Sequence, residues 1–441
     1  MRYRIRNIIM WLIILEMMLL TACQKNIYEK NSKNISSVNE DQINNSINKE
    51  NKNYSTITKN KDESKTIEQN DSVRGKYEDK EEDKKEEKVS ASNTVKEPIS
   101  ITEQSEDEKY TLNYSAENDF VSLTIPKNQW DTFIKNGYYS KMPNQENRGM
   151  KISQEWSNFI YNWVNEEYDF IVCVLNTDSR PNELPMNGYY QAIQNDIVGI
   201  GNAGYDKPFF NYSNLYGDTN SKLQGIIYLT HNDVLYDGPI LHELMHRWGN
   251  YIMLSDYGMC HWGDSDIYGR LGGYEKIVEK DGQSIIKTYK RYWGGPYAPF
   301  ELYLMGLIPK EEVPDITVTE DYSSRIINET EWNRIDGEDI TVDGKIKTKT
   351  YTIDEIISGA ISNENQKANV GERIPNYKDS KKQFNILFVN VDYDNMTKTE
   401  LESMNNQIRL LCYEGEYDDK IYNFWEACKG KGSIESTIFL K

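Results

Sequence analysis

The chain has 441 residues, of which 51 are basic and 70 are acidic, and its formal net charge at pH 7 is −19. This negative balance argues against a nucleic-acid partner, because nucleic-acid phosphates would be repelled. Eight of the 9 tryptophans lie at or beyond Trp130, so the folded part of the chain is expected away from its N-terminal segment.

The first residues have the layout of a secretory signal. Arginines within 2–6 precede a mostly apolar run at 8–20, which is too short for a comfortable membrane span of about 20 residues. The run ends in Leu-Thr-Ala-Cys and resembles the lipobox of bacterial lipoproteins. This resemblance implies a signal peptide at 1–22, a lipid on Cys23 and a chain held at the extracellular face of the cell membrane. An uncleaved signal anchor is the alternative.

Residues 23–108 are mostly Asn, Lys, Glu and Ser. Such a segment cannot bury enough apolar surface to offset the entropy of ordering it, so we expect a disordered tether. The following 330 or so residues can bury a sizeable core. We expect an N-terminal lobe at 109–249 that ends in a helix, followed by a mixed C-terminal lobe at 250–441.

Strands and helices are mixed in the predicted order, which indicates an α+β fold with a twisted mixed sheet. Alternating or unbroken apolar runs predict strands at 119–125, 170–175, 197–200, 225–230 and 384–391. Helical spacing and capping residues predict helices at 152–164, 299–306, 352–359 and 399–412. Ser153 is the expected cap of the first helix. The last two helices are opened by capping boxes that start at Thr352 and Thr399.

Gly199, Gly201 and Gly204 spell G-x-G-x-x-G directly after a predicted strand. A dinucleotide site requires that this motif open a helix. Pro208 follows within a few residues and favours a loop instead. We therefore interpret the glycines as a flexible loop and expect no nucleotide cofactor.

The stretch from Gly238 to Gly249 contains the sequence H-E-x-x-H, which on a helix is typical of zinc hydrolases. Asp237 can cap this helix, Pro239 suits its first turn and Gly249 suits its end. Apolar residues at helical spacing provide a face toward the core: Leu241, Leu244, Met245 and Trp248.

His242 and His246 lie one above the other on such a helix, so both imidazoles can reach one zinc ion. Glu243, next to the first ligand, can accept a proton from the metal-bound water. An amphipathic helix with histidines at its polar edge is the alternative. The chain has only 4 histidines, however, and His261 is a third one within the same short window. This clustering favours a metal site.

A catalytic zinc ion usually takes three protein ligands. The third ligand must come from outside the helix, and the scarcity of histidine favours His261. Zinc also accepts carboxylates, which leaves four acidic rivals open: Asp256, Asp264, Asp266 and Glu275. His231 is interpreted as a loop or surface histidine.

The segment from His242 to Gly249 resembles the H-E-x-x-H-x-x-G core of the metzincin metallopeptidases. Ile252 stands where that family usually has its third histidine, whereas His261-Trp262 is similar to the later histidine of the leishmanolysin-like branch. The resemblance implies a zincin-like fold, a methionine beneath the metal, for which Met305 is a candidate, and zinc-dependent hydrolysis of peptide bonds with Glu243 as base. It also implies that a peptide substrate pairs with the strand at 225–230.

Four cysteines remain beyond Cys23. Cys412 and Cys428 are the nearest pair for a disulfide, although other pairings are open. Cys173 is expected as a buried thiol in its strand, and Cys260 as a packing residue.

Taken with the lipobox, these features predict an extracellular, membrane-anchored zinc metalloendopeptidase that acts on proteins or peptides. Two alternatives stay open at this point. One is a surface binding protein whose zincin fold has lost activity, and the other is a zinc amidase that acts on the cell wall.

Overall fold

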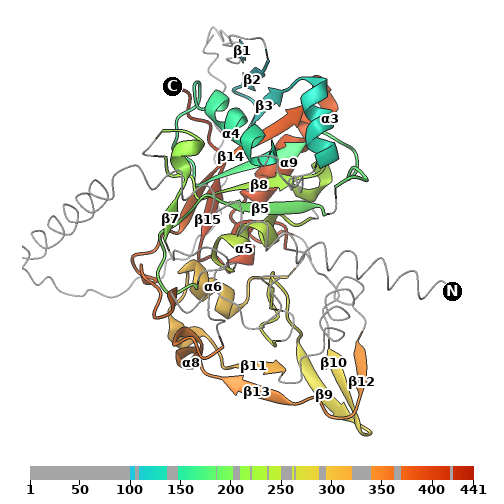
Figure 1. Ribbon diagram of the computed structural model, residues 1–441, viewed down its shortest axis with the longest axis vertical. Coiled ribbons are helices and arrows are strands. Elements are labelled where there is room, and N and C mark those ends of the chain that lie inside the picture. The colour runs from blue at the N-terminus through green and yellow to red at the C-terminus, as the bar shows by residue number, and fades with distance from the viewer. Residues whose placement is uncertain are drawn as a thin grey trace, which may run out of the picture. The chain divides into compact units, whose positions relative to one another are not determined.

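The structure is a computed structural model (Figure 1). It describes residues 100–104, 109–136, 148–184, 186–201, 209–218, 221–235, 238–249, 261–262, 265–287, 295–319, 339–361, 369–417 and 421–441. Expectations for the signal peptide, the lipidated cysteine, most of the tether and several single residues lie outside this set: Cys23, Gly204, Pro208, Asp237, Ile252, Asp256, Cys260 and Asp264. Within it, no helix has the length and apolar character needed to cross a membrane.

The chain divides into two compact units, Met1–Glu97 and Pro98–Lys441, and all described residues belong to the second. Strand β1 (Ser100–Gln104) lies inside the range that we expected to be tether, and it pairs with β2 (Thr111–Ser115). The strand-forming part of the chain therefore starts earlier than expected.

A mixed sheet of eight strands forms the centre of this unit and confirms the α+β class. Its order is β1-β2-β3-β14-β4-β8-β5, and β15 pairs with β14. The neighbours β3, β14, β4 and β8 run parallel, whereas β1, β2 and β5 are antiparallel to the strands beside them. The bounds not yet given are β3 (Val121–Thr124), β4 (Phe170–Leu175), β5 (Gly188–Ala192), β8 (Gly225–Leu229), β14 (Gln383–Asp392) and β15 (Ser433–Glu435).

The middle strand β14 comes from the C-terminal part of the chain. It pairs with β3 on one side and with β4 on the other. The division that we expected at 249/250 therefore does not separate two sheets, because the strand that joins the N-terminal strands lies far beyond it in sequence (Figure 1).

Most of the predicted strands are confirmed, with ends shifted by a residue or two, but two expectations are wrong. Residues 197–200 form a turn, in which Val198 makes a single bridge to Ile374. Gly199 and Gly201 adopt left-handed φ values of 80° and 76° there. Both are held by hydrogen bonds to Asn369 rather than lying loose.

The second error concerns the strand expected to receive a substrate. β8 lies between β4 and β5, so its two edges are already paired. Among the described strands, β5 is the one at this edge of the sheet.

The predicted helices are present, with two caps corrected. α4 (Arg148–Ile160) begins before Ser153, which lies inside the helix. α9 (Lys398–Leu411) is capped by Thr397, whose side chain accepts from the Glu400 N–H, and not by Thr399. The others are α3 (Lys127–Asn136), α5 (Ile240–Gly249), α6 (Pro299–Met305), α8 (Ile353–Ile357), α10 (Phe424–Ala427) and the short 3-10 turns η1 (Ser213–Leu215), η2 (Asn232–Leu235) and η3 (Lys310–Glu312).

Helices cover both faces of the sheet and bury two apolar layers. Side chains alternate along β14, so Phe384, Ile386 and Phe388 belong to one layer and Leu387 and Val389 to the other. The first layer includes α5, α6 and α9, and the second includes α3 and α4 (Figure 1). The first apolar cluster also extends to α8, which lies beside β13 in Figure 1. Helix α5 carries the candidate site. The position of the site is therefore fixed by the burial of α5 in the first layer.

Smaller sheets complete the unit. β9 (Lys276–Lys280), β10 (Gln283–Lys287) and β12 (Ile340–Asp343) form a three-stranded sheet over a small cluster of its own. β11 (Ile316–Thr319) pairs with β13 (Thr348–Tyr351), and β6 (Gln194–Asn195) pairs with β7 (Phe210–Asn211).

Candidate metal centre

Helix α5 is almost entirely enclosed: His246 is the one residue of its ten that is not buried. The Glu243 N–H donates to the Pro239 carbonyl at 2.7 Å and so forms the first turn expected for that proline. Gly249 has no left-handed φ, but a Cβ on it would lie 2.1 Å from Leu271 Cδ1. The helix ends at Gly249 as expected, and the absence of a Cβ there allows close packing against Leu271.

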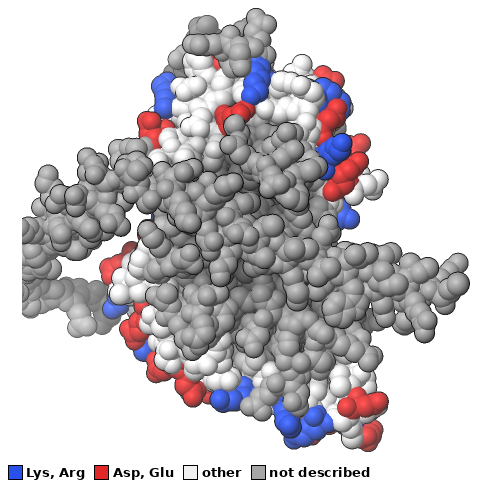
Figure 2. Space-filling view, viewed as in Figure 1, with Lys and Arg blue, Asp and Glu red and all other residues white. Residues whose placement is uncertain are grey.

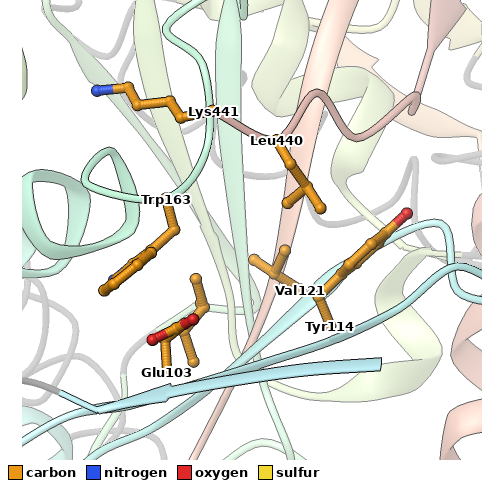
Figure 3. A pocket seen from close by; sticks show the side chains of 7 residues that line it. Glu103, Tyr114, Val121, Trp163, Leu440 and Lys441 are labelled. Carbon is orange, nitrogen blue, oxygen red and sulfur yellow. The ribbon is translucent and has the colours of Figure 1, made fainter. Parts of the chain in front are cut away.

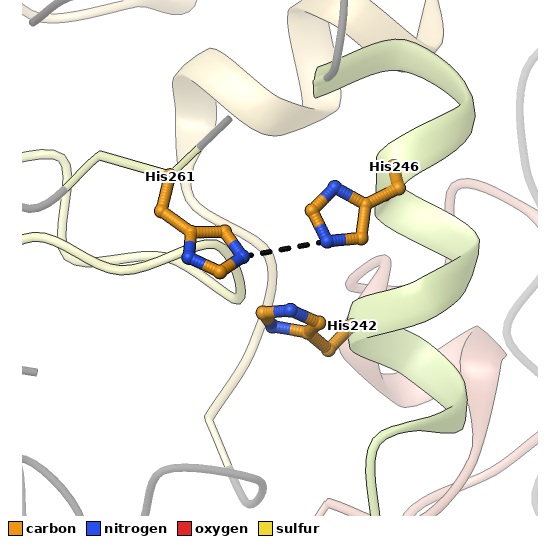
Figure 4. Close-up of side chains that lie close together, drawn as sticks. All are labelled: His242, His246 and His261. Atoms are coloured by element: carbon orange, nitrogen blue, oxygen red, sulfur yellow. Dashed lines mark hydrogen bonds between the residues drawn. The ribbon is translucent and has the colours of Figure 1, made fainter. Parts of the chain in front are cut away.

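The three histidines of the predicted site converge on one point (Figure 4). His242 and His246 project from α5, and His261 faces them from a separate segment. The ring centroid of His242 lies 4.8 Å from that of His246 and 4.9 Å from that of His261. One nitrogen from each ring can be chosen so that all three lie within 4.8 Å of one another. The fold thus assembles a set of donors that could hold one metal ion.

The spacing of two of these donors fits a tetrahedral ion. The Nε2 atoms of His246 and His261 are 3.4 Å apart. Two nitrogens at about 2.0–2.1 Å from one tetrahedral zinc ion are separated by about 3.3–3.4 Å. Three neutral imidazoles with a remaining open position are also a donor set that catalytic zinc accepts.

The orientation of His242 is set by a backbone group. Its Nδ1 lies 2.7 Å from the carbonyl oxygen of Arg270, and this ring is only 4% exposed. A carbonyl oxygen can only accept, so Nδ1 carries the proton and donates. Nε2 is then the nitrogen with the lone pair available to an ion. Such a bond to the second nitrogen is the usual support for a metal-binding histidine.

Glu243 is buried beside His242, with 6% of its surface exposed. Burial raises the pKa of its carboxyl group to about 8, and a hydrogen bond from the Tyr190 backbone N–H acts in the opposite direction. Tyr190 belongs to β5, as does Gly188, where a Cβ would lie 2.9 Å from Glu243 Oε1. The carboxyl group therefore lies directly against the edge strand of the sheet.

The acidic rivals for the third ligand that are described have other partners. Asp266 accepts from the Thr317 N–H at 2.8 Å, and Glu275 forms an ion pair with Lys276 at 3.1 Å. His231 lies outside the cluster, with its Nδ1 3.1 Å from Thr230 Oγ1. Among the described residues that could ligate a metal, His242, His246 and His261 are the group that comes together.

Two supporting groups were missed by the sequence analysis. The Arg270 carbonyl acts through its backbone, so no side-chain pattern could reveal it. Glu301 did leave a signal, since it is the one charged residue in the apolar run at 298–307. It is fully buried and contacts the segment that carries His261.

The remaining sequence expectations have mixed outcomes. Cys412 and Cys428 are free thiols, so the suggested disulfide is wrong. Cys173 is a buried thiol as expected, and burial raises its pKa to about 12. Met305 ends α6 and is buried in the same apolar layer as α5.

A separate cavity of about 240 Å³ lies near the C-terminus (Figure 3). Its lining is largely apolar and contains none of the candidate site residues: Glu103, Leu112, Tyr114, Val121, Trp163, Leu440 and Lys441. Charged side chains of both signs lie interspersed along the visible rim of the described surface in Figure 2. Neither feature adds a ligand or a base to the histidine cluster.

No family model, curated protein or solved structure matches this chain. Of the resemblance to the metzincins, the structure bears out the convergence of the three histidines, which could bind a metal ion.

Proposed function

We propose that the chain is a zinc-dependent peptidase whose metal ligands are His242, His246 and His261. The observation that carries this proposal is the convergence of three imidazoles, two of them on the helix turn that also carries the buried carboxyl group of Glu243. A structural histidine cluster would have no need for Glu243 at that place, because burial of an acid is costly.

The chain's own residues would divide the work as follows. The three imidazoles would hold the ion, and the Arg270 carbonyl fixes the ring of His242 for that purpose. A bound zinc ion would supply Lewis-acid activation of a water molecule and of the scissile carbonyl group.

Glu243 would move the proton. One of its carboxylate oxygens would accept a proton from the attacking water and then deliver it to the nitrogen that leaves. Burial favours the protonated form of this group. A divalent cation on the neighbouring His242 would favour the carboxylate and so lower the pKa toward the range of a useful base.

The edge strand β5 offers a place for the substrate. Among the described strands it is paired on one side only, by β8, and Glu243 lies against it. An extended peptide could add to this edge by backbone hydrogen bonds and bring its carbonyl group near Glu243. The lipobox would place this reaction at the outer face of the cell membrane.

The first experiment measures metal in the purified full-length chain by elemental analysis. We expect zinc in an equimolar ratio with the protein. Absence of zinc, both after gentle purification and after incubation with added zinc, would remove the proposal.

The second experiment measures hydrolysis with a library of quenched fluorescent peptides. Wild-type protein should cleave a subset of them, and Glu243→Gln should lose about 100- to 10,000-fold in rate while it keeps its zinc. If zinc is bound but only cell-wall amides are cleaved, the amidase alternative replaces the peptidase. If neither substrate class is cleaved, the protein is a binding protein of this fold.

A further inference from the structure

We infer that Glu301 is a positioning residue that holds two of the three proposed zinc ligands in place. This inference rests on the proposed metal centre and adds to it a residue that contacts neither the ion nor the substrate. Glu301 lies in the first turn of α6 and is 0% exposed.

The Glu301 carboxylate accepts four hydrogen bonds from three separate segments. Oε1 accepts from the indole N–H of Trp262 at 2.9 Å and from the Leu271 N–H at 2.8 Å. Oε2 accepts from the N–H groups of Arg270 and Ala298, both at 2.9 Å. These bonds offset the cost of removing a carboxylate from water, which is high when such a group has no partners.

Two of these bonds lead to proposed metal ligands. Trp262 directly follows His261, and its indole is fully buried against Glu301. Arg270 supplies the carbonyl group that orients His242, and its own N–H is bound to Glu301. One carboxylate thus fixes His261 through its neighbour and His242 through its hydrogen-bond acceptor.

The backbone around Glu301 is shaped to admit the carboxylate. A Cβ on Gly269 would lie 2.3 Å from Glu301 Oε2 and 2.5 Å from Oε1. Gly269 does not have a left-handed φ, and the three atoms nearest to a Cβ there all belong to the Glu301 carboxylate. The absence of a side chain at Gly269 therefore leaves room for the Glu301 carboxylate and supports its role in positioning the ligands.

An amide cannot replace this carboxylate. A glutamine at 301 would present an NH₂ group, which only donates, to one of the two pairs of N–H donors. Two buried donors would lose their acceptor. In either orientation of the amide one of these donors is the N–H of Arg270 or of Leu271, so the segment that supplies the Arg270 carbonyl would shift away from α6. Glu301→Gln is therefore nearly equal in size to the wild type but removes the clamp.

Asp392 provides a matched control. It is another buried carboxylate, 4% exposed, and it accepts from the N–H groups of Tyr393 and Asp394 and from Asn176 Nδ2. None of these three hydrogen bonds leads to a residue of the histidine cluster. Asp392→Asn imposes the same chemical change on the same kind of site and so accounts for any general loss of stability.

The test measures the zinc dissociation constant of the full-length chain by competition with a chelator. We expect Glu301→Gln to weaken zinc binding by about 10- to 100-fold, the range found when supporting residues of metal sites are changed. Asp392→Asn should bind zinc as the wild type does. In addition, the visible absorption bands of the cobalt-substituted protein should shift in Glu301→Gln and not in Asp392→Asn, because only the former displaces ligands.

Two further variants keep the inference testable if Glu301→Gln does not fold. Trp262→Phe removes one of the four bonds and should weaken zinc binding less than Glu301→Gln. Gly269→Ala should weaken it through the steric conflict with the carboxylate. Wild-type zinc affinity and an unchanged cobalt spectrum in the variants that fold would overturn the inference while leaving the proposed function intact. Equal losses in Glu301→Gln and Asp392→Asn would also overturn it. Failure of the proposed function would be recognised separately, because the wild-type chain itself would then bind no zinc.

Discussion

Helix α5 and the segment from His261 to Glu301 contribute to the same site in different ways. α5 places His242, Glu243 and His246 by the period of a helix, which is a local property of ten residues. The second segment places His261 and the Arg270 carbonyl through bonds between residues that are 28 to 39 positions apart in sequence. One half of the site is therefore fixed by local geometry and the other half by tertiary contacts.

This difference explains which features of the site can be predicted from a single sequence. A helical repeat and its neighbouring base can be read directly, but a bond from a carbonyl or a buried carboxylate depends on the whole fold. The experiments below separate what each half contributes, beginning with the largest expected effect.

Loss of a histidine on either half should abolish metal binding. His246→Ala removes a ligand from α5 and His261→Ala removes one from the second segment, so both should reduce zinc from an equimolar ratio to background in elemental analysis. His231→Ala and Glu275→Ala serve as controls and should retain zinc, because neither side chain belongs to the cluster. If Glu275→Ala loses zinc and His261→Ala does not, the third ligand is misassigned.

Removal of the metal should expose the cost of burying Glu243 on α5. Its pKa in the folded state is about 8, above the ordinary value of 4.5. The folded state then retains a proton that the unfolded chain releases, so this contribution to stability is full below about pH 4.5 and is lost as the pH rises through 8. In chelated protein, the free energy of unfolding should fall over this interval by an amount on the order of a few kcal/mol.

The comparison that isolates this effect is Glu243→Gln in the same chelated state. Its unfolding free energy, measured by denaturant titration at each pH, should lack this decline because the amide does not titrate. Parallel pH profiles for the two proteins would show that the burial of Glu243 has no such energetic cost.

The contact between the two halves can be tested at Gly249. An alanine there would bring a Cβ to 2.1 Å from Leu271 Cδ1, which joins the end of α5 to the second segment. Overpacking of this kind typically costs about 1–3 kcal/mol, although alanine in a helix would otherwise gain up to about 1 kcal/mol over glycine. We expect a net loss of stability in Gly249→Ala, measured by thermal or denaturant unfolding.

A double-mutant cycle with Leu271→Ala supplies the control. Removing the leucine side chain should relieve the conflict, so the two substitutions together should cost less than the sum of their separate effects. Additive losses would mean that Gly249 and Leu271 are not in conflict and that the glycine has another role.

The fold as a whole also has some features that are set by local sequence and others that are set by tertiary contacts. The strand at 170–175, the helix at 299–306 and the capping box at Thr352 were all predicted correctly, since each depends on neighbours in sequence. The central position of β14 in the sheet and the interior position of β8 were not predicted. Strand order depends on pairing between segments that are far apart in sequence. The run at 197–200 has strand-forming residues, yet its glycines turn the chain toward Asn369.

Even a local signal can be ambiguous, and α9 shows this with the smallest effect that we predict. The sequence contains two overlapping candidates for a capping box, Thr397 with Glu400 and Thr399 with Glu402. In the structure Thr397 Oγ1 accepts from the Glu400 N–H at 3.3 Å, and Glu400 Oε2 accepts from the Thr397 N–H at 2.6 Å. Thr397→Ala should therefore cost about 1 kcal/mol of unfolding free energy.

Thr399→Ala is the matched control, since Thr399 is exposed inside the helix and should change stability by no more than about 0.5 kcal/mol. Both variants leave α5 and the second segment untouched, so zinc binding should be equal in the two. Pattern rules rate the two threonines alike, and in the structure the reciprocal hydrogen bonds between Thr397 and Glu400 distinguish them. A larger loss in Thr399→Ala would mean that the helix begins two residues later, where the sequence pattern alone had placed it.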